Sequence, residues 1–178
     1  MQLTVPGVPD VYQGTELWDF SLVDPDNRRP VDYSHRKKLL KQFKKEGFGE
    51  FTESWPSGLP KLGMVQRLLH FRREAPDLFA YGSYRPLELH GRHAQSVLAF
   101  AREYQDQRSI TLVPRTARKV GWPCLGEAWE ETAVMLPNNW ANESWASVLE
   151  PKILFEPSGQ LRVADLLSRL PVAVLRQV

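Results

Sequence analysis

A change in the spacing of apolar residues near Tyr81 is the feature that most constrains the fold. Before this position apolar side chains recur at helical spacing, and after it the apolar runs are short and separated by turn residues. Helical spacing favours amphipathic helices, whereas short alternating runs favour half-buried strands. We therefore expect an α+β chain, with helices first and an antiparallel β-sandwich-like domain after them.

Two helices are expected before residue 81. The first begins after Asp32, buries an apolar stripe that includes Phe43, and ends at Gly47, a residue suited to a left-handed helix cap. The second covers residues Leu62 to Ala75, where apolar positions follow steps of four, three and four, and it is expected to end at Pro76. Both helices should pack one face against a core.

The second half of the chain reads as a series of strands joined by turns. Their number and spacing are typical of an antiparallel sandwich or an open barrel. A short helix is expected from Arg162 to Arg169, before the last strand. The predicted strands lie in SYRPLEL, SVLAFAR, SITLVPR, ETAVMLP, KILFE and PVAVLRQ.

The first 31 residues are rich in Pro, Asp and Gly and read mostly as loop, with one short strand expected from Asp10 to Gln13. The stretch DPDNRR, residues 24–29, places two carboxylates beside two guanidiniums and is bounded by prolines. Such a loop can use its ion pairs to fix its own shape. It can equally present an Asp acceptor beside a forked Arg donor to the vicinal hydroxyls of a sugar. The residues alone leave both interpretations open.

Charge and composition exclude several classes of function. The net charge is only +2, from 23 basic and 21 acidic residues, so no cationic surface for nucleic acid is indicated. No apolar run approaches the roughly 20 residues of a membrane helix, and no secretory signal opens the chain. The single cysteine, Cys124, fits a reducing compartment, so a cytoplasmic protein is expected. The basic stretch from Arg36 to Lys45 is interpreted as a solvated helix face.

The usual catalytic signatures are missing from the sequence. There is no phosphate-binding loop, dinucleotide fingerprint, HExxH motif or nucleophile elbow, so no cofactor is expected. The four histidines have no metal-ligand spacing, so no metal site is expected either. Six tryptophans exceed the average and suit sugar faces as well as cores. Trp18, close to the polar loop, is the one we assign to a sugar.

Ordered blocks of the sequence carry a family resemblance. The run PGVPDVYQGTE resembles the segment around the eighth barrel strand of the α-amylase superfamily, and LVDPDNRRPVD narrows this to the maltooligosyl trehalose synthase family. Further matching blocks are KLGMVQRLLHFRREAPDLFAYGSYRPL, SVLAFAR and LPVAVL, which together span nearly the whole chain. Gly63 departs from the pattern, since a bulky apolar residue is expected there.

The resemblance implies a (β/α)₈ barrel followed by a C-terminal β-domain. Residues 1–80 would then be the remnant of the barrel end, with its eighth strand, substrate loop and two helices, and residues 81–178 the β-domain. In this superfamily the nucleophile and the acid lie on earlier barrel strands, so no catalytic residue is expected in this chain. The parent would be an isomerase of trehalose biosynthesis, moving the reducing-end α-1,4 linkage of a maltooligosaccharide to α,α-1,1, and the chain alone would be inactive.

The resemblance also implies which residues bind substrate. Asp24 and Arg28 match the Asp and Arg that hold sugar hydroxyls in related enzymes, and Tyr12, Gln13 and Glu16 are weaker candidates at the strand end. Asp26 and Arg29 would brace the loop. The alternative function is a noncatalytic carbohydrate-binding or structural β-domain. Surfaces that the absent barrel strands would cover are expected to support self-association.

Overall fold

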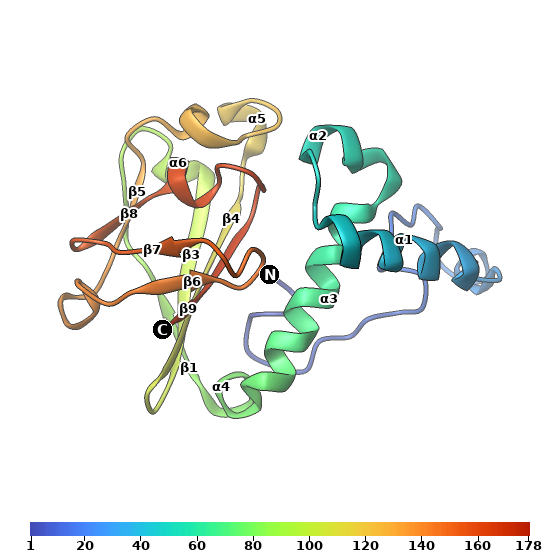
Figure 1. Ribbon diagram of the computed structural model, residues 1–178, viewed down its shortest axis with the longest axis horizontal. Coiled ribbons are helices and arrows are strands. Elements are labelled where there is room, and N and C mark those ends of the chain that lie inside the picture. The colour runs from blue at the N-terminus through green and yellow to red at the C-terminus, as the bar shows by residue number, and fades with distance from the viewer.

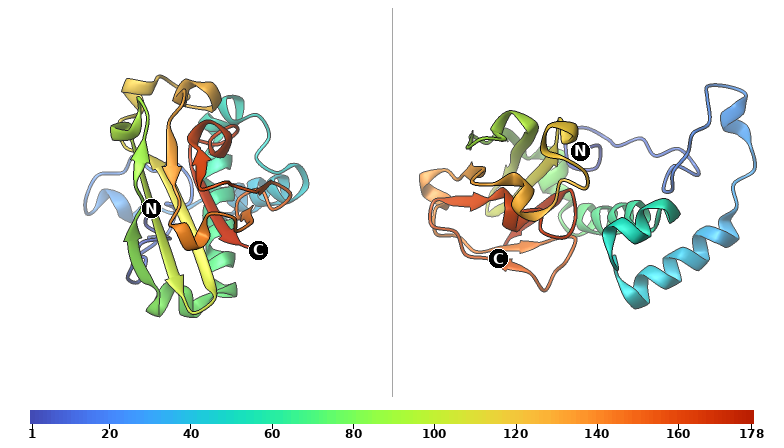
Figure 2. Two further views of the ribbon diagram at one scale, coloured as in Figure 1. Left: turned by 90° about the vertical axis from the view of Figure 1, so that its left-hand side faces the viewer. Right: turned by 90° about the horizontal axis from the view of Figure 1, so that it is seen from above.

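The helices of the first eighty residues lie beside a β-rich part that the rest of the chain forms (Figure 1). The computed structural model describes residues 1–178, and the segment before the first helix runs as an extended loop around the helices (Figure 2). The mixture of helices and antiparallel sheet confirms the expected α+β class. None of the helices is both long enough and apolar enough to span a bilayer.

Helix α1 (Tyr33–Glu46) has the predicted ends. The Oδ1 atom of Asp32 accepts the N–H of His35 at 2.9 Å, which satisfies one of the free donors of the first turn. Gly47 ends the helix with φ of 72°, and its N–H donates to the carbonyl of Phe43. These two caps explain why the helix spans the residues between them.

The second predicted helix is longer than expected and is followed by another. Helix α3 (Leu59–Glu74) starts after a short connection formed by α2 (Phe51–Ser54) and the 3₁₀ turn η2 (Trp55–Ser57). Pro76 does not simply end the helical region, because it is the first residue of α4 (Pro76–Tyr81). A proline suits a first helical position, where no N–H is needed.

Gly63 is accounted for by its neighbour on α1. A Cβ atom at this position would overlap the ring of Phe43, within 2.7 Å of its Cδ2, so glycine leaves the room that this ring occupies between the two helices. Phe43 is 3% exposed and occupies the volume that a larger residue at position 63 would fill. The departure from the expected bulky residue is therefore compensated within the same helix pair.

The β part contains two antiparallel sheets. One has six strands in the order β1-β3-β4-β9-β6-β7, and the other has three in the order β2-β5-β8. Strands lie in all six predicted segments, while β6 and β8 were not predicted. The bounds are β1 (Ser83–Pro86), β2 (Leu89–His90), β3 (Val97–Tyr104), β4 (Gln107–Pro114), β5 (Ala133–Met135), β6 (Trp145–Ser147), β7 (Leu154–Phe155), β8 (Gln160–Arg162) and β9 (Ala173–Gln177), with short helices α5 (Ala117–Val120) and α6 (Val163–Leu166).

The strand predicted from Asp10 to Gln13 is wrong. This stretch carries no regular structure, and the carbonyl of Tyr12 accepts the N–H of Thr15 in a turn. A strand requires a neighbouring strand for its hydrogen bonds. Both sheets of this chain form after residue 82, and neither includes this stretch.

Two hydrophobic clusters hold the fold together. The first lies within the β part and contains the fully buried Trp129, Trp140 and Trp145, which confirms the core interpretation for these tryptophans. The second combines the helices with residues of the β part, including Leu149 and Val174. The helices are therefore packed onto the β part through a shared core.

Candidate functional site

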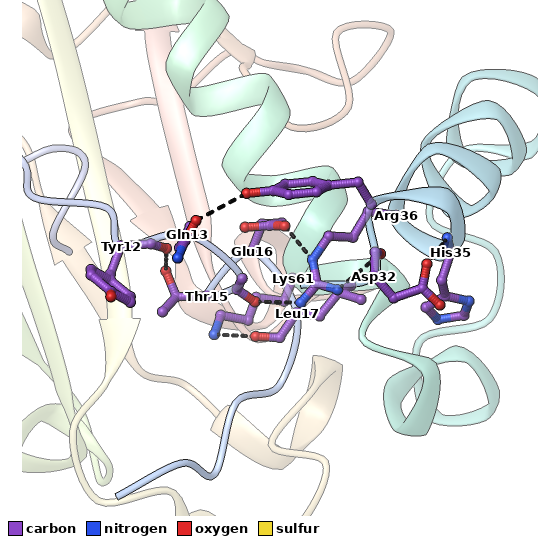
Figure 3. A network of polar contacts seen from close by, with 11 residues as sticks. Tyr12, Gln13, Thr15, Glu16, Leu17, Asp32, His35, Arg36 and Lys61 are labelled. Atoms are coloured by element: carbon purple, nitrogen blue, oxygen red, sulfur yellow. Dashed lines mark hydrogen bonds and ion pairs between the residues drawn. The ribbon is translucent and has the colours of Figure 1, made fainter. Parts of the chain in front are cut away.

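The loop ahead of α1 is organised around Arg36 (Figure 3). The Nη2 atom of Arg36 donates to the carbonyl of Gly14 at 2.8 Å, and Nη1 donates to the carbonyl of Asp32 at 3.1 Å. Its Nε atom forms an ion pair with Glu16, and both side chains are largely buried. One guanidinium thus ties residues 14–16 to the first turn of α1.

Gln13 and Tyr12 lie at the start of this loop with different surroundings. The Oε1 atom of Gln13 accepts the hydroxyl of Tyr33 at 3.3 Å, which holds the amide against α1 (Figure 3). The carbonyl of Tyr12 accepts the hydroxyl of Thr15 at 2.7 Å, while the Tyr12 side chain is 46% exposed. Tyr12 therefore presents its ring to solvent from a fixed backbone.

Residues 17–21 are fixed by Lys61 and by a local turn. The Nζ atom of Lys61 donates to the carbonyl of Leu17 at 2.8 Å, and burial lowers the pKa of this ammonium. Asp19 accepts both the backbone N–H and the hydroxyl of Ser21, and these hydrogen bonds lower the pKa of its carboxyl group. A charged anchor and an ionised turn residue thus shape the chain just before the DPDNRR loop.

Within the DPDNRR loop two ion pairs form around the 3₁₀ turn η1 (Asp26–Arg28). Asp24 accepts from the Nε of Arg28 at 2.5 Å, and these side chains are 56% and 71% exposed, respectively. Asp26 accepts the backbone N–H of Leu22 at 2.9 Å and pairs with Arg29. The second pair therefore braces the loop, whereas the first leaves a carboxylate oxygen and the outer guanidinium nitrogens facing solvent.

The five predicted site residues form two groups. Tyr12, Gln13 and Glu16 lie together in the loop ahead of α1, while Asp24 and Arg28 pair with each other in the next turn of the chain. No hydrogen bond or ion pair joins one group to the other. The arrangement gives an acceptor and a forked donor side by side, which is suited to neighbouring hydroxyl groups.

Sequence reasoning missed the residues that hold these groups in place. Arg36 was assigned to a solvated helix face, and this is wrong for Arg36 because its side chain is 18% exposed and bonded to the loop. The interpretation holds for the five lysines that follow it, at positions 37, 38, 41, 44 and 45, which are all exposed. Nothing in the sequence indicates that Tyr33 and Lys61 hold the loop, since their partners are 20 and 44 residues away along the chain.

Trp18 lies between the two groups in the sequence but is not free. Its indole N–H donates to the carbonyl of Trp55 at 2.7 Å, and the two ring centroids are 4.2 Å apart. Lys61 lies over the Trp18 ring, with its Nζ 5.2 Å from the centroid. Trp18 is packed against Trp55 and Lys61, so it can contact a sugar only together with this cluster of rings.

Comparison with solved structures places this architecture in a class. The chain superimposes on part of an α-amylase from Geobacillus thermoleovorans with a TM-score of 0.59 at 20% identity, covering 99% of this chain and 31% of that one. A likeness at this identity speaks for the fold alone. The fold is that of the C-terminal part of an α-amylase-like enzyme.

Relatives with higher sequence identity all have the name of one enzyme. Maltooligosyltrehalose synthase from Arthrobacter ramosus matches with a TM-score of 0.79 at 35% identity, over 99% of this chain and 21% of its own. Proteins described as maltooligosyl trehalose synthase in two strains of Mycobacterium tuberculosis are 37% identical over 175 residues, which is 98% of this chain and 19% of theirs. No family model matches the chain.

This chain is therefore homologous to the C-terminal portion of maltooligosyl trehalose synthase. It spans about a fifth of the length of these relatives.

Proposed function

We propose that this chain forms the C-terminal part of an intramolecular transglucosidase that converts the reducing-end α-1,4 linkage of a maltooligosaccharide into an α,α-1,1 linkage. The observation that carries the proposal is the 37% identity to maltooligosyl trehalose synthases over 98% of the chain. In this reaction the reducing-end α-1,4 bond breaks and releases the terminal glucose, while the rest of the chain stays bound to the enzyme through the anomeric carbon of the broken bond. The anomeric hydroxyl of the released glucose then attacks, so the product has the same atoms as the substrate.

The Asp24–Arg28 pair is proposed to hold sugar hydroxyls away from the bond that reacts. The Nε atom of Arg28 donates to Asp24. The two outer nitrogens of Arg28 and the second carboxylate oxygen of Asp24 remain available to bind sugar hydroxyls. Because each partner orients the other, both are set in place before a sugar arrives. The Asp26–Arg29 pair supports this geometry by fixing the loop. Tyr12, through its exposed ring, is proposed to contact the sugar as well.

The chain alone is proposed to be catalytically inactive. Retaining transfer at a glucosidic bond requires a carboxylate nucleophile and a carboxylic acid about 5 Å apart. The carboxylates of the candidate site, Glu16 and Asp24, are each committed to an arginine, an arrangement suited to binding rather than to proton donation. The pair that does the chemistry is proposed to come from a portion corresponding to the other four-fifths of the relatives.

Residues 81–178 are proposed to form a β-domain that braces residues 1–80, with the substrate loop and helices. The shared hydrophobic cluster favours this role, because Leu149 and Val174 of the β part pack with residues of α1, α3 and α4. This role corresponds to one of the alternative functions, that of a structural β-domain. It is compatible with the enzymatic proposal, since a braced loop is a better-ordered binding surface.

Exposed apolar side chains in the loop ahead of α1 are proposed to make the isolated chain self-associate. Val8, Phe20, Leu22 and Val23 are between 77% and 96% exposed, and apolar side chains exposed in such number favour association in water. Light scattering should detect dimers or larger species, and Phe20→Ser with Leu22→Ser should return the chain to monomers. A monomeric chain at the concentrations used for structural work would contradict this.

We also propose a cytoplasmic location for the protein, because the unpaired, buried Cys124 suits a reducing compartment.

A chimeric enzyme tests the proposed function. The Arthrobacter ramosus enzyme is expressed with its matching fifth replaced by this chain, and it is incubated with maltohexaose. We expect a nonreducing trehalosyl product from the chimera and none from this chain alone. Arg28→Ala in the chimera should raise KM about 10-fold or more, by loss of charge-assisted hydrogen bonds, while Arg29→Ala, the matched control, should cost less. A folded chimera with no product, or product from the chain alone, would contradict the proposal.

A further inference from the structure

Three tryptophans from distant parts of the chain meet at the surface between the helices and the β part. Trp18 precedes the DPDNRR loop, Trp55 starts η2, and Trp122 follows α5. The ring centroids of Trp18 and Trp55 are 4.2 Å apart, and those of Trp55 and Trp122 are 5.3 Å apart. We call these three rings the tryptophan row. We propose that the tryptophan row is a second carbohydrate-binding surface, which holds an α-glucan chain outside the Asp24–Arg28 loop.

Trp122 differs from every other tryptophan of the chain in its exposure. Trp122 is 62% exposed, whereas Trp129, Trp140 and Trp145 are fully buried. The N–H of the Trp122 indole donates to no protein group, although the corresponding group of Trp129 donates to a backbone carbonyl. An exposed ring with a free donor offers an apolar face and a polar edge together, which is what a pyranose ring presents in return.

The exposed ring of Trp122 is supported from the protein side. Phe51, which is 2% exposed, lies 6.0 Å from it between centroids, and Trp55 meets it at an interplanar angle of 67°. The helices α2 and α5, which precede Trp55 and Trp122 in the sequence, face each other at the top of the view in Figure 1. A ring held this way loses little freedom when a ligand stacks on it, which lowers the entropic cost of binding.

The surroundings of the row favour a neutral polar ligand. Lys61 lies over the Trp18 ring, and the carboxylate of Asp19 acts on the same ammonium. Cationic and anionic groups therefore stand together at this end of the row, which suits hydroxyl groups better than an anion. The rings are also tilted, by 47° and then 67°. The 67° angle sets the Trp55 ring edge to face against Trp122, and Trp55 and Lys61 cover the ring of Trp18, so Trp122 offers the face on which a sugar stacks.

The class of ligand rests on the proposed function, because the relatives are named for a maltooligosyl substrate. The location does not rest on it, since the row contains none of the residues of the Asp24–Arg28 loop. Continuity along the chain links the two, because Trp18 lies six residues before Asp24. One glucan chain held on the row would keep further substrate close to the loop.

Affinity electrophoresis of the intact chain in gels that contain soluble starch tests the proposal. We expect the wild-type chain to be retarded, and Trp122→Ala to weaken starch binding roughly tenfold, as the loss of one stacked ring would. Tyr81→Ala is the matched control, because Tyr81 is an exposed aromatic residue, 71% exposed, outside the row. This variant should bind like wild type. Maltohexaose should compete with starch, and cellohexaose should not.

Several outcomes would overturn the proposal: an unretarded wild-type chain, equal retardation of wild type and Trp122→Ala, or equal competition by cellohexaose. Trp122→Phe, which keeps a ring, should retain part of the binding, and urea unfolding of each variant shows that the fold persists. Because starch binding is measured on the chain alone, it is independent of the chimera. If the chain binds starch but the chimera is inactive, the proposed function is refuted and the tryptophan row is supported. If the chimera is active but the chain does not bind starch, the tryptophan row is refuted and the proposed function is supported.

Discussion

Replacing Arg102 by methionine is expected to lower the free energy of unfolding by about 2–4 kcal/mol. Arg102 is 1% exposed and has no carboxylate partner. Its guanidinium instead donates to four backbone carbonyls, those of Thr4 and Phe79 at 3.2 Å each, Ser83 at 2.9 Å and Gly82 at 2.8 Å. The side chain therefore joins the start of the chain, the end of α4 and the strand β1.

The magnitude follows from the acceptors that lose their donor. The carbonyls of Thr4 and Phe79 bond to Arg102 in a buried setting, and an unsatisfied buried group costs about 1–3 kcal/mol. Methionine keeps most of the apolar packing of the arginine stem. Burial and the nearby Arg72 lower the pKa of Arg102, so its positive charge is unfavourable at this position. Removing the charge therefore offsets part of the lost free energy of unfolding. The net cost should fall in the lower half of the range set by two orphaned carbonyls.

Urea unfolding followed by tryptophan fluorescence measures this difference. Arg73→Met is the matched control, because Arg73 is an exposed residue of α3 and its loss should change stability by about 0.5 kcal/mol or less. Arg102→Lys should recover only part of the loss, since one ammonium cannot reach all four acceptors. Equal midpoints for Arg102→Met and Arg73→Met would refute the reasoning. Should Arg102→Met prove too unstable for a full curve, increased amide exchange at residues 1–8 reports the same loss.

Three further predictions concern packing, capping and the thiol. Gly63→Ala should destabilise the chain by about 1–3 kcal/mol in urea unfolding, because its Cβ would clash with Phe43, and adding Phe43→Leu should recover part of this; a neutral Gly63→Ala would contradict the packing. Asp32→Ala should cost about 1 kcal/mol by loss of the α1 cap, and an unchanged urea midpoint would contradict it. Burial raises the pKa of Cys124, so a thiol reagent at pH 8 should react with the unfolded chain much faster than with the folded one. Because the unfolded thiol ionises first, stability should also fall as pH rises above about 8.5.

Patterns that act over a few residues predicted the two long helices, the short helix α6 and most of the strands. The Asp32 cap and the Gly47 stop are local signals, and α1 fits between them. Strands β3 and β4 are eight residues each, long enough to show a pattern. Strands β6 (WAS) and β8 (QLR) have three residues each and, unlike the equally short β5 (AVM), contain no run of apolar residues that would mark a strand.

The residues that hold the candidate site together were beyond local patterns. The acidic and basic cluster DPDNRR was visible in the sequence, and its ion pairs span three or four residues. Arg36 resembled the lysines that follow it, and only the folded chain separates the one residue that points at the loop from those that point at water. The predicted strand at residues 10–13 failed for the same reason, because strand formation depends on a neighbour and not on the stretch itself.

The loop ahead of α1 has almost no regular structure, so its backbone carbonyls need other donors. Arginine and lysine side chains supply several of them. Arg72 donates to the carbonyls of Leu3 and Gly7, Arg36 to that of Gly14, and Lys61 to that of Leu17. Each of these cations comes from α1 or α3. The two helices thus hold the loop from one side by charge. Leu3 and Leu17 are buried, but Val8, Phe20, Leu22 and Val23 are left on the surface, where a further protein surface can pack against them.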